Sequence, residues 1–141
     1  MGHAPRSGKP ARRQAVSVIA SIINVTIRKD DVIDYDTLIV SVHAADVLDM
    51  DNSGEMLLFM KTLIQGGVKK LLVDMNGLEF IDSAGIGMLV ESAKLLRQRK
   101  GDLALIGVPE RIQRIFQPIK LNRFIKIFDS QEEVISYFRL I

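Results

Sequence analysis

The sequence predicts an α/β fold in which helices pack on a mixed, mostly parallel β-sheet, in the order β-β-α-β-α-β-α-β-α. Three observations support this prediction. Short apolar runs, typical of strands that are buried on both faces, alternate with segments of helical periodicity. Strands that are separated by helices pair in parallel and are covered by those helices. The chain has 141 residues and is 48% hydrophobic, which suffices for one compact core but not for two.

The first two strands are predicted to form a hairpin. Ile23, Val25 and Ile27 alternate with polar residues, as expected for a half-buried strand. The segment 37–43 (TLIVSVH) has the composition of a second strand. Four acidic residues between the two strands indicate a turn: Asp30, Asp31, Asp34 and Asp36.

The first helix follows the hairpin. Asn52 and Glu55 have the spacing of a capping box, and Gly66 and Gly67 mark the end of the helix. The apolar residues between these signals are spaced as on one helical face: Met56, Met60, Leu63 and Ile64.

The remaining elements alternate between strands and helices. Apolar runs predict strands at 71–73, 103–108 and 124–128. Between them, helices are predicted over 86–99 and after Pro109, a residue that suits the first turn of a helix. A last helix is expected to start at a second capping box, formed by Ser130 and Glu133.

The chain divides into a short extension and one domain. Residues 1–21 form a predicted flexible, basic extension, part of which could be an expression tag, and residues 22–141 form the domain. Residues 1–13 carry four cations and no acid, so the rest of the chain has a net charge of −2 although the whole chain has +2. Direct binding to nucleic acid is therefore disfavoured.

Composition also excludes several classes of site. The chain has no cysteine and only two histidines, which removes disulfides, thiolate metal sites and cysteine nucleophiles. We predict no metal site, no cofactor and no catalytic residue, because Ser83 lies in no nucleophile elbow and His43 is expected to be a core or strand-end histidine. No apolar run reaches the roughly 18 residues of a membrane span, so we expect a cytoplasmic protein.

The most informative segment is LLVDMNGLEFIDSAGIGMLVESAKLLRQRKG. It combines a buried strand that ends in an aspartate, a loop with an Asp-Ser pair, two glycines and an amphipathic helix. This segment resembles the core motif of the STAS domain family, and specifically of bacterial anti-sigma factor antagonists. The residues that match the motif are Asp74, Phe80, Asp82, Ser83, Gly85, Ile86 and Gly87. The order of elements from about residue 22 to 138 is similar as well.

The resemblance implies a function by partner switching. It implies that the unmodified antagonist binds an anti-sigma factor that is also a serine kinase, and thereby displaces a sigma factor. Phosphorylation of a serine in the motif ends the contact, and a PP2C-type phosphatase restores it. Many family members have two adjacent hydroxyl groups, but here the second position is Ala84. Either Ser83 is the phosphoacceptor or the protein is not switched by phosphorylation.

The chemistry of a helix start agrees with a phosphoacceptor at Ser83. Free backbone N–H groups and the helix dipole tolerate an anion there, so the modified protein should stay folded. Ser83 or Asp82 could also be no more than an N-cap, and the two roles are compatible. The residues expected to contact the partner are Asp82, Ser83, Ala84, Gly85, Ile86, Gly87, Met88 and Leu95.

The last two of these residues are expected on the outward face of the helix. Met88 and Leu95 are predicted to form an apolar docking strip, unless a neighbouring loop covers them or they are scattered surface apolar residues. Gly85 and Gly87 are expected to let the partner approach the backbone closely. Eight acids and no Lys or Arg lie within 30–55, and they form either a solvated face or a surface that steers a basic partner.

One alternative function keeps the same fold. A STAS module without regulated phosphorylation could act as a scaffold in a sensory complex or as an accessory subunit of a transporter.

Overall fold

A computed structural model of the chain describes residues 19–27, 33–44 and 46–141. Its main feature is a five-stranded sheet in the order β1-β2-β4-β6-β7. The first two strands are antiparallel and all other neighbours are parallel, which confirms the predicted mixed, mostly parallel sheet. The strands are β1 (Ile19–Ile27), β2 (Ile33–His43), β4 (Lys70–Asp74), β6 (Asp102–Ile106) and β7 (Lys126–Phe128).

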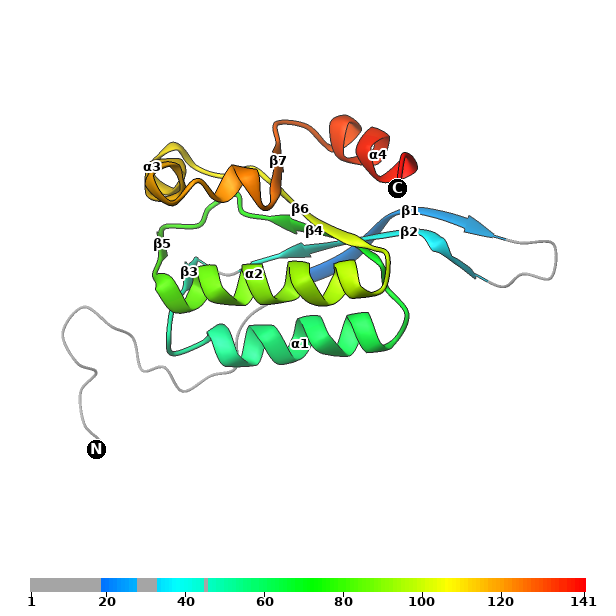
Figure 1. Cartoon of the computed structure of the whole chain (residues 1–141), viewed down its shortest axis with the longest axis horizontal. Helices are drawn as coiled ribbons and strands as arrows, with labels where there is room; N and C mark the ends of the chain where they lie inside the picture. Colours follow the sequence, from blue (N-terminus) through cyan, green and yellow to red (C-terminus); the bar gives the residue numbers. More distant parts are fainter. Residues whose placement is uncertain (1–18, 28–32, 45) are drawn as a thin grey trace.

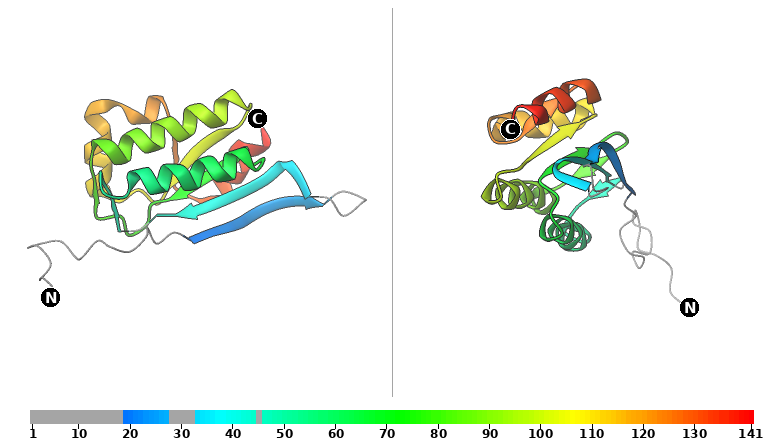
Figure 2. Two further views of the ribbon diagram at one scale, coloured as in Figure 1. Left: turned by 90° about the horizontal axis from the view of Figure 1, so that it is seen from below. Right: turned by 90° about the vertical axis from the view of Figure 1, so that its right-hand side faces the viewer.

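Helices cover both faces of this sheet. The helical elements are α1 (Ser53–Gln65), α2 (Ser83–Gln98), α3 (Glu110–Ile119), the 3-10 helix η1 (Leu121–Arg123) and α4 (Gln131–Arg139). Helices α1 and α2 lie side by side on one face, and α4 lies on the other (Figures 1 and 2). The strands between these layers are buried on both faces, which explains their continuous apolar runs.

Two very short strands lie beside the main sheet. β3 (Val47–Leu48) pairs in parallel with β5 (Phe80–Ile81), and β5 leads directly into α2. The sequence predicts a loop at β5, because two residues are too few to show any periodicity. This small ribbon joins the loop before α1 to the loop before α2 at one end of the molecule (Figure 1).

The N-terminal hairpin differs in detail from the prediction. β2 begins at Ile33, so Asp34 and Asp36 lie in a strand rather than in the turn. Strand pairing overrides the turn preference of these aspartates, as in the pair of Thr26 and Asp34. Asp30 and Asp31 lie outside the described residues. The extension over 1–21 stays a prediction: residues 1–18 are not described, and β1 begins at Ile19.

The two predicted capping boxes have different outcomes. The Ser130 hydroxyl accepts a hydrogen bond from the Glu133 backbone N–H at 3.2 Å, as predicted, while the Glu133 carboxylate accepts from the N–H of Asp129 at 3.0 Å. At α1, Asn52 is the N-cap residue, but its side chain does not cap the helix. The Asn52 amide instead donates to the Val47 carbonyl oxygen at 2.7 Å, so it stabilises the preceding loop.

A buried carboxylate attaches α4 to the rest of the core. Asp102 is 6% exposed at the start of β6, and its Oδ1 accepts from Arg97 Nε of α2 at 2.9 Å. Its Oδ2 accepts a hydrogen bond from the hydroxyl of Tyr137 on α4. Burial, followed by this hydrogen bond, raises the pKa of Tyr137 from 10.0 to about 12. Asp102 therefore joins three elements that are far apart in the sequence.

This raised pKa predicts a loss of stability at alkaline pH. In the folded state the Tyr137 hydroxyl keeps its proton up to about pH 12, whereas in the unfolded chain it loses the proton near pH 10. The contribution of this group is therefore complete below pH 10 and is lost as the pH rises through 12. We expect Asp102→Asn to lower the pKa of Tyr137, measured by ultraviolet titration with Tyr137→Phe as the control. An unchanged tyrosine titration curve would contradict the role of Asp102.

Candidate functional site

The start of α2 is held by one aspartate side chain. Asp82 is the N-cap residue, with extended backbone, and its Oδ1 accepts from the backbone N–H of Gly85 at 3.0 Å. An aspartate suits this position because its side chain replaces a missing backbone acceptor, and its charge favours the positive end of the helix dipole. The capping role therefore belongs to Asp82 and leaves the Ser83 hydroxyl outside it.

The same carboxylate joins two loops. Asp82 Oδ2 accepts from the backbone N–H of Met50 at 3.0 Å, and the backbone N–H of Asp82 donates to the Leu48 carbonyl oxygen at 3.1 Å. The Met50 loop is stabilised internally as well, since Asp49 Oδ1 accepts from the N–H of Asp51 at 3.0 Å. Met50 is thereby fixed beside the start of α2, although it lies 32 residues earlier in the chain.

Loss of this aspartate is expected to loosen the site. Asp82→Ala removes a helix cap, which costs about 1–2 kcal/mol of stability, and it also releases the loop that carries Met50. Asp82→Asn is the matched control, because its amide oxygen can still cap the helix. Urea unfolding of the two variants checks this expectation. Equal stability of Asp82→Ala and the unmodified chain would contradict the capping role.

Ser83 is the first residue of α2, and its side chain is exposed. The first N–H groups of a helix have no partner within the helix, so an anion at this position meets favourable electrostatics. The other serine in this helix, Ser92, is fully buried, and its hydroxyl donates to Met88 Sδ at 3.7 Å. Ser83 is therefore the accessible serine hydroxyl of α2.

The two glycines of the motif have different roles. A Cβ atom at Gly85 would lie 2.5 Å from the Leu48 carbonyl oxygen and 2.8 Å from Cγ1 of Ile81. Gly85 is buried where α2 packs directly on the β3–β5 ribbon, so its backbone is not open to close approach as expected, and its contact with a partner stays a prediction. Gly87 is exposed, and a Cβ there would meet nothing within 4 Å. An approaching protein can reach the backbone at Gly87.

The predicted outward position of Met88 on α2 is wrong, whereas a docking role for Leu95 stays a prediction. Met88 is only 3% exposed and belongs to the core, and Leu95 is half-buried and packs against that core. The prediction assumed that α2 buries one face, against the sheet. In the structure α1 lies alongside α2 and covers this flank as well (Figure 2). Ala84 and Ile86 are half-buried, so they lie at the margin of the accessible surface.

Two exposed apolar side chains near Ser83 were not among the residues expected to contact the partner. Met50 is 75% exposed in the loop joined to Asp82, and Phe80 is 50% exposed on β5, three residues before Ser83. We call Met50, Phe80, Ser83 and Gly87 together the Ser83 surface. Sequence signals for the first two did exist, since each is a large apolar residue directly beside acidic residues in a predicted loop.

Acidic residues surround this surface. Asp46, Asp51 and Glu79 are exposed on the same two loops, and the backbone N–H of Glu79 donates to the Asp46 carbonyl oxygen at 2.7 Å. Asp49, by contrast, is 6% exposed and helps to build its loop. The acidic segment predicted from the sequence is therefore partly structural and partly a charged rim around the apolar residues.

His43 lies at the end of β2, as expected. Its Nδ1 is 3.5 Å from Oδ2 of Asp74, at the end of the neighbouring strand, and its side chain is 42% exposed. Among the residues that the structure describes, there is no group of three or more His, Cys, Asp or Glu side chains that could hold a metal ion. None of the helices in this part of the chain combines the length and the apolar character that crossing a bilayer requires.

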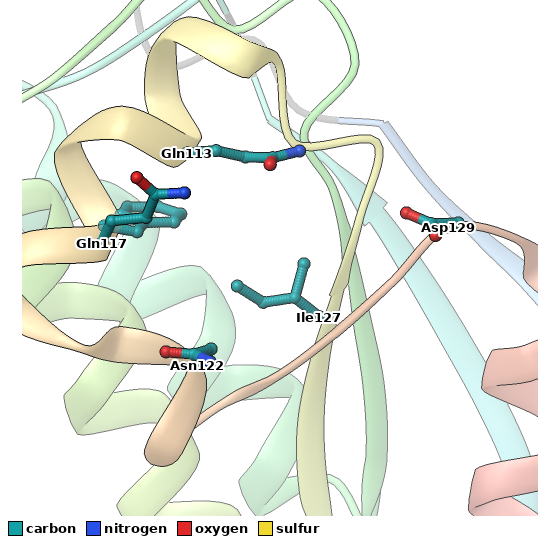
Figure 3. Close-up of a pocket in the computed structure, with 6 residues that line it drawn as sticks. Gln113, Gln117, Asn122, Ile127 and Asp129 are labelled. Carbon is teal, nitrogen blue, oxygen red and sulfur yellow. The ribbon is translucent and has the colours of Figure 1, made fainter.

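A small hollow lies between α3, η1 and β7 (Figure 3). Phe116 and Ile127 form its apolar part, and Gln113, Asn122 and Asp129 are among its polar lining residues. Its volume of about 210 Å³ is below the range of typical small-molecule sites. The Gln113 amide donates to the Val108 carbonyl oxygen at 3.0 Å, so this polar group of the hollow already has a partner within the protein.

Sequence comparison links the chain to named regulators. It is 34% identical over 64 residues to the anti-sigma-B factor antagonist of Listeria monocytogenes, which covers 45% of this chain and 56% of that protein. It is 27% identical over 85 residues to the anti-sigma-B factor antagonist of Staphylococcus aureus, with coverage of 60% and 79%. The matched region thus spans about half the length of the Listeria protein. These relatives bear the name of a regulator rather than of an enzyme.

Solved structures share the fold. The anti-sigma factor antagonist SpoIIAA in its unphosphorylated form has a TM-score of 0.59 and 21% identity, over 87% of this chain and all of that chain. The phosphorylated form of SpoIIAA, a Bacillus cell fate determinant, has a TM-score of 0.57 and 20% identity, over 84% and 98%. A sulfate transporter family protein from Wolinella succinogenes has a TM-score of 0.60 and 18% identity, over 71% and 84%.

A family model gives the broadest match. The model of the STAS domain matches residues 24–134, which include the end of β1, every other strand of the main sheet and the whole of α2. The strand order and the placement of the helices agree with the structural neighbours. The chain therefore belongs to the STAS domain family.

Proposed function

We propose that this chain is an anti-sigma factor antagonist that binds an anti-sigma factor through the Ser83 surface and is released when Ser83 is phosphorylated. The observation that carries the proposal is the exposed Ser83 side chain at the start of a capped helix, with exposed Met50 and Phe80 on the two segments joined to that helix start. The named relatives and the matching motif support this role.

The apolar side chains account for binding. Met50 and Phe80 present large apolar area on loops that hydrogen bonds hold in place, so little conformational entropy is lost when a partner covers them. Side chains of this kind at the centre of an interface contribute most of the binding energy. The exposed acids around them attract a partner with a basic surface and speed its approach.

Phosphorylation of Ser83 is expected to destabilise the complex through a charge placed within the contact. A phosphoryl group adds a charge of about −1.5 to −2 at pH 7, at the middle of the surface that the partner must cover. The helix start tolerates this charge in the free protein, because water still solvates it. In the complex the same group would be desolvated beside Met50 and Phe80, which is costly for an ion. The complex is therefore destabilised while the fold is not.

The position of Ala84 limits the proposal to one acceptor. The second hydroxyl of the family motif is missing, and Ser92 is too deeply buried to be modified in the folded protein. The partners of this reaction are the anti-sigma factor itself, acting as a serine kinase, and a PP2C-type phosphatase that removes the phosphoryl group. This role belongs to the cytoplasm, where transcription takes place.

The proposal is tested by incubating the full chain with ATP and the anti-sigma factor kinases of its own genome. Intact-mass analysis should show one added phosphoryl group, and peptide mapping should place it at Ser83. Ser83→Ala should add none but should still bind the kinase. If the chain binds and is never phosphorylated, it is a scaffold or accessory module instead. If it binds none of these kinases, the proposed function is wrong.

A further inference from the structure

A second exposed apolar surface lies on α3, outside the Ser83 surface. Ile115 and Ile119 are 37% and 52% exposed, although α3 has a buried face formed by Ile112 and Phe116. Arg111, Ile115 and Ile119 are spaced four residues apart, so they follow one another along one stripe of the helix. The hollow described above lies on the other flank of α3, since Gln113 and Gln117 line it (Figure 3).

Cations surround these isoleucines. Residues 110–126 contain five Lys or Arg and a single acid, Glu110. Glu110 Oε2 accepts from Arg114 Nη2 at 3.0 Å, and both side chains stay highly exposed at 81% and 71%. We call the exposed set around the two isoleucines the α3 rim: Arg111, Arg114, Ile115, Ile119, Lys120 and Arg123.

We infer that the α3 rim docks on the surface of a bilayer that contains anionic lipids. Cationic side chains beside exposed aliphatic ones on one short helix are the arrangement that binds lipid headgroups and the upper part of the acyl layer. α3 lies at the outer edge of the molecule (Figure 1), and Arg111, Ile115 and Ile119 are exposed along it. A flat bilayer can meet such a ridge directly, whereas an acidic protein would need a complementary hollow. This inference does not depend on Ser83.

Co-sedimentation with lipid vesicles tests this inference. The full chain should sediment with vesicles of equal parts phosphatidylglycerol and phosphatidylcholine, and not with phosphatidylcholine alone. Each cation near an anionic surface contributes about 1 kcal/mol, so Arg111→Gln with Arg123→Gln should weaken binding about 30-fold. Ile115→Ser with Ile119→Ser should also weaken it, roughly tenfold, through the lost apolar burial.

Matched controls use exposed residues of the same kinds outside α3. Leu58 on α1 is 67% exposed and Lys94 on α2 is exposed, so Leu58→Ser and Lys94→Gln should leave vesicle binding unchanged. The inference is overturned if the unmodified chain stays in the supernatant with the anionic vesicles. It is also overturned if the α3 variants sediment with these vesicles as much as the unmodified chain. If the basic residues of segment 1–13 alone bound the vesicles, the α3 variants would still sediment like the unmodified chain. Binding to poly-glutamate but not to vesicles would show an acidic protein partner and overturn it as well.

Discussion

Ser83→Asp is expected to weaken binding of the anti-sigma factor about 30- to 100-fold, which corresponds to about 2–2.7 kcal/mol. The substitution puts a permanent carboxylate where the phosphoryl group would be, on the Ser83 surface that carries Met50 and Phe80. A buried charge without a partner is costly in an interface. The effect should be smaller than that of phosphorylation, because a carboxylate carries a single charge. Calorimetric titration of the kinase with each variant measures it.

Ser83→Asp should leave the stability of the fold nearly unchanged. Ser83 is exposed at the N-terminal end of α2, where an acidic side chain is electrostatically favourable. The free energy of unfolding should therefore stay within about 1 kcal/mol of that of the unmodified chain. A large loss of stability would mean that Ser83 is packed rather than presented to solvent.

Ser83→Asn is the control that separates charge from size. Asparagine has the shape of aspartate without its charge, so it should retain most of the affinity. If both variants lose affinity equally, the site excludes bulk rather than charge. If neither loses affinity, Ser83 is not part of the contact, and the proposed switch is refuted even if Ser83 is phosphorylated.

The sequence predicted the sheet and its covering helices well, because these elements have strong periodic signals. The buried strands at 71–73 and 103–108 read as uninterrupted apolar runs, and both lie in the centre of the sheet. The β3–β5 ribbon was missed for a physical reason. Strands of two residues are too short to show a periodic pattern in the sequence. They are revealed only by their pairing and by the hydrogen bonds that join Asp82 and its neighbours to the Met50 loop.

The sequence predicted the position of Asp82 and Ser83, but not which apolar residues are exposed near them. Asp82 and Ser83 lie where the motif indicated, but Met88 is in the core because α1 covers a second flank of α2. A helical wheel for one helix cannot show how many neighbours that helix has. Met50 and Phe80 were missed for the converse reason, since their position near Ser83 depends on contacts between distant segments.

Gly85→Ala is expected to destabilise the protein by about 3 kcal/mol. The added methyl group would lie 2.5 Å from the Leu48 carbonyl oxygen, a backbone atom that already accepts from the N–H of Asp82. Neither α2 nor the ribbon can move without breaking that bond, and forced overpacking of this kind costs about 1–3 kcal/mol or more. Urea unfolding measures the loss, and complete failure to fold would be the same effect in a stronger form.

Gly87→Ala is the matched control, two residues further along the same helix. Nothing lies within 4 Å of the new methyl group, and alanine favours a helix over glycine by up to about 1 kcal/mol. This variant should therefore be as stable as the unmodified chain or more so. A larger side chain, as in Gly87→Gln, should then weaken partner binding without any loss of stability, because it stands on the Ser83 surface. If Gly87→Gln bound the partner normally, the contact would have to lie elsewhere, whereas a stable Gly85→Ala would refute the close packing of α2 on β3.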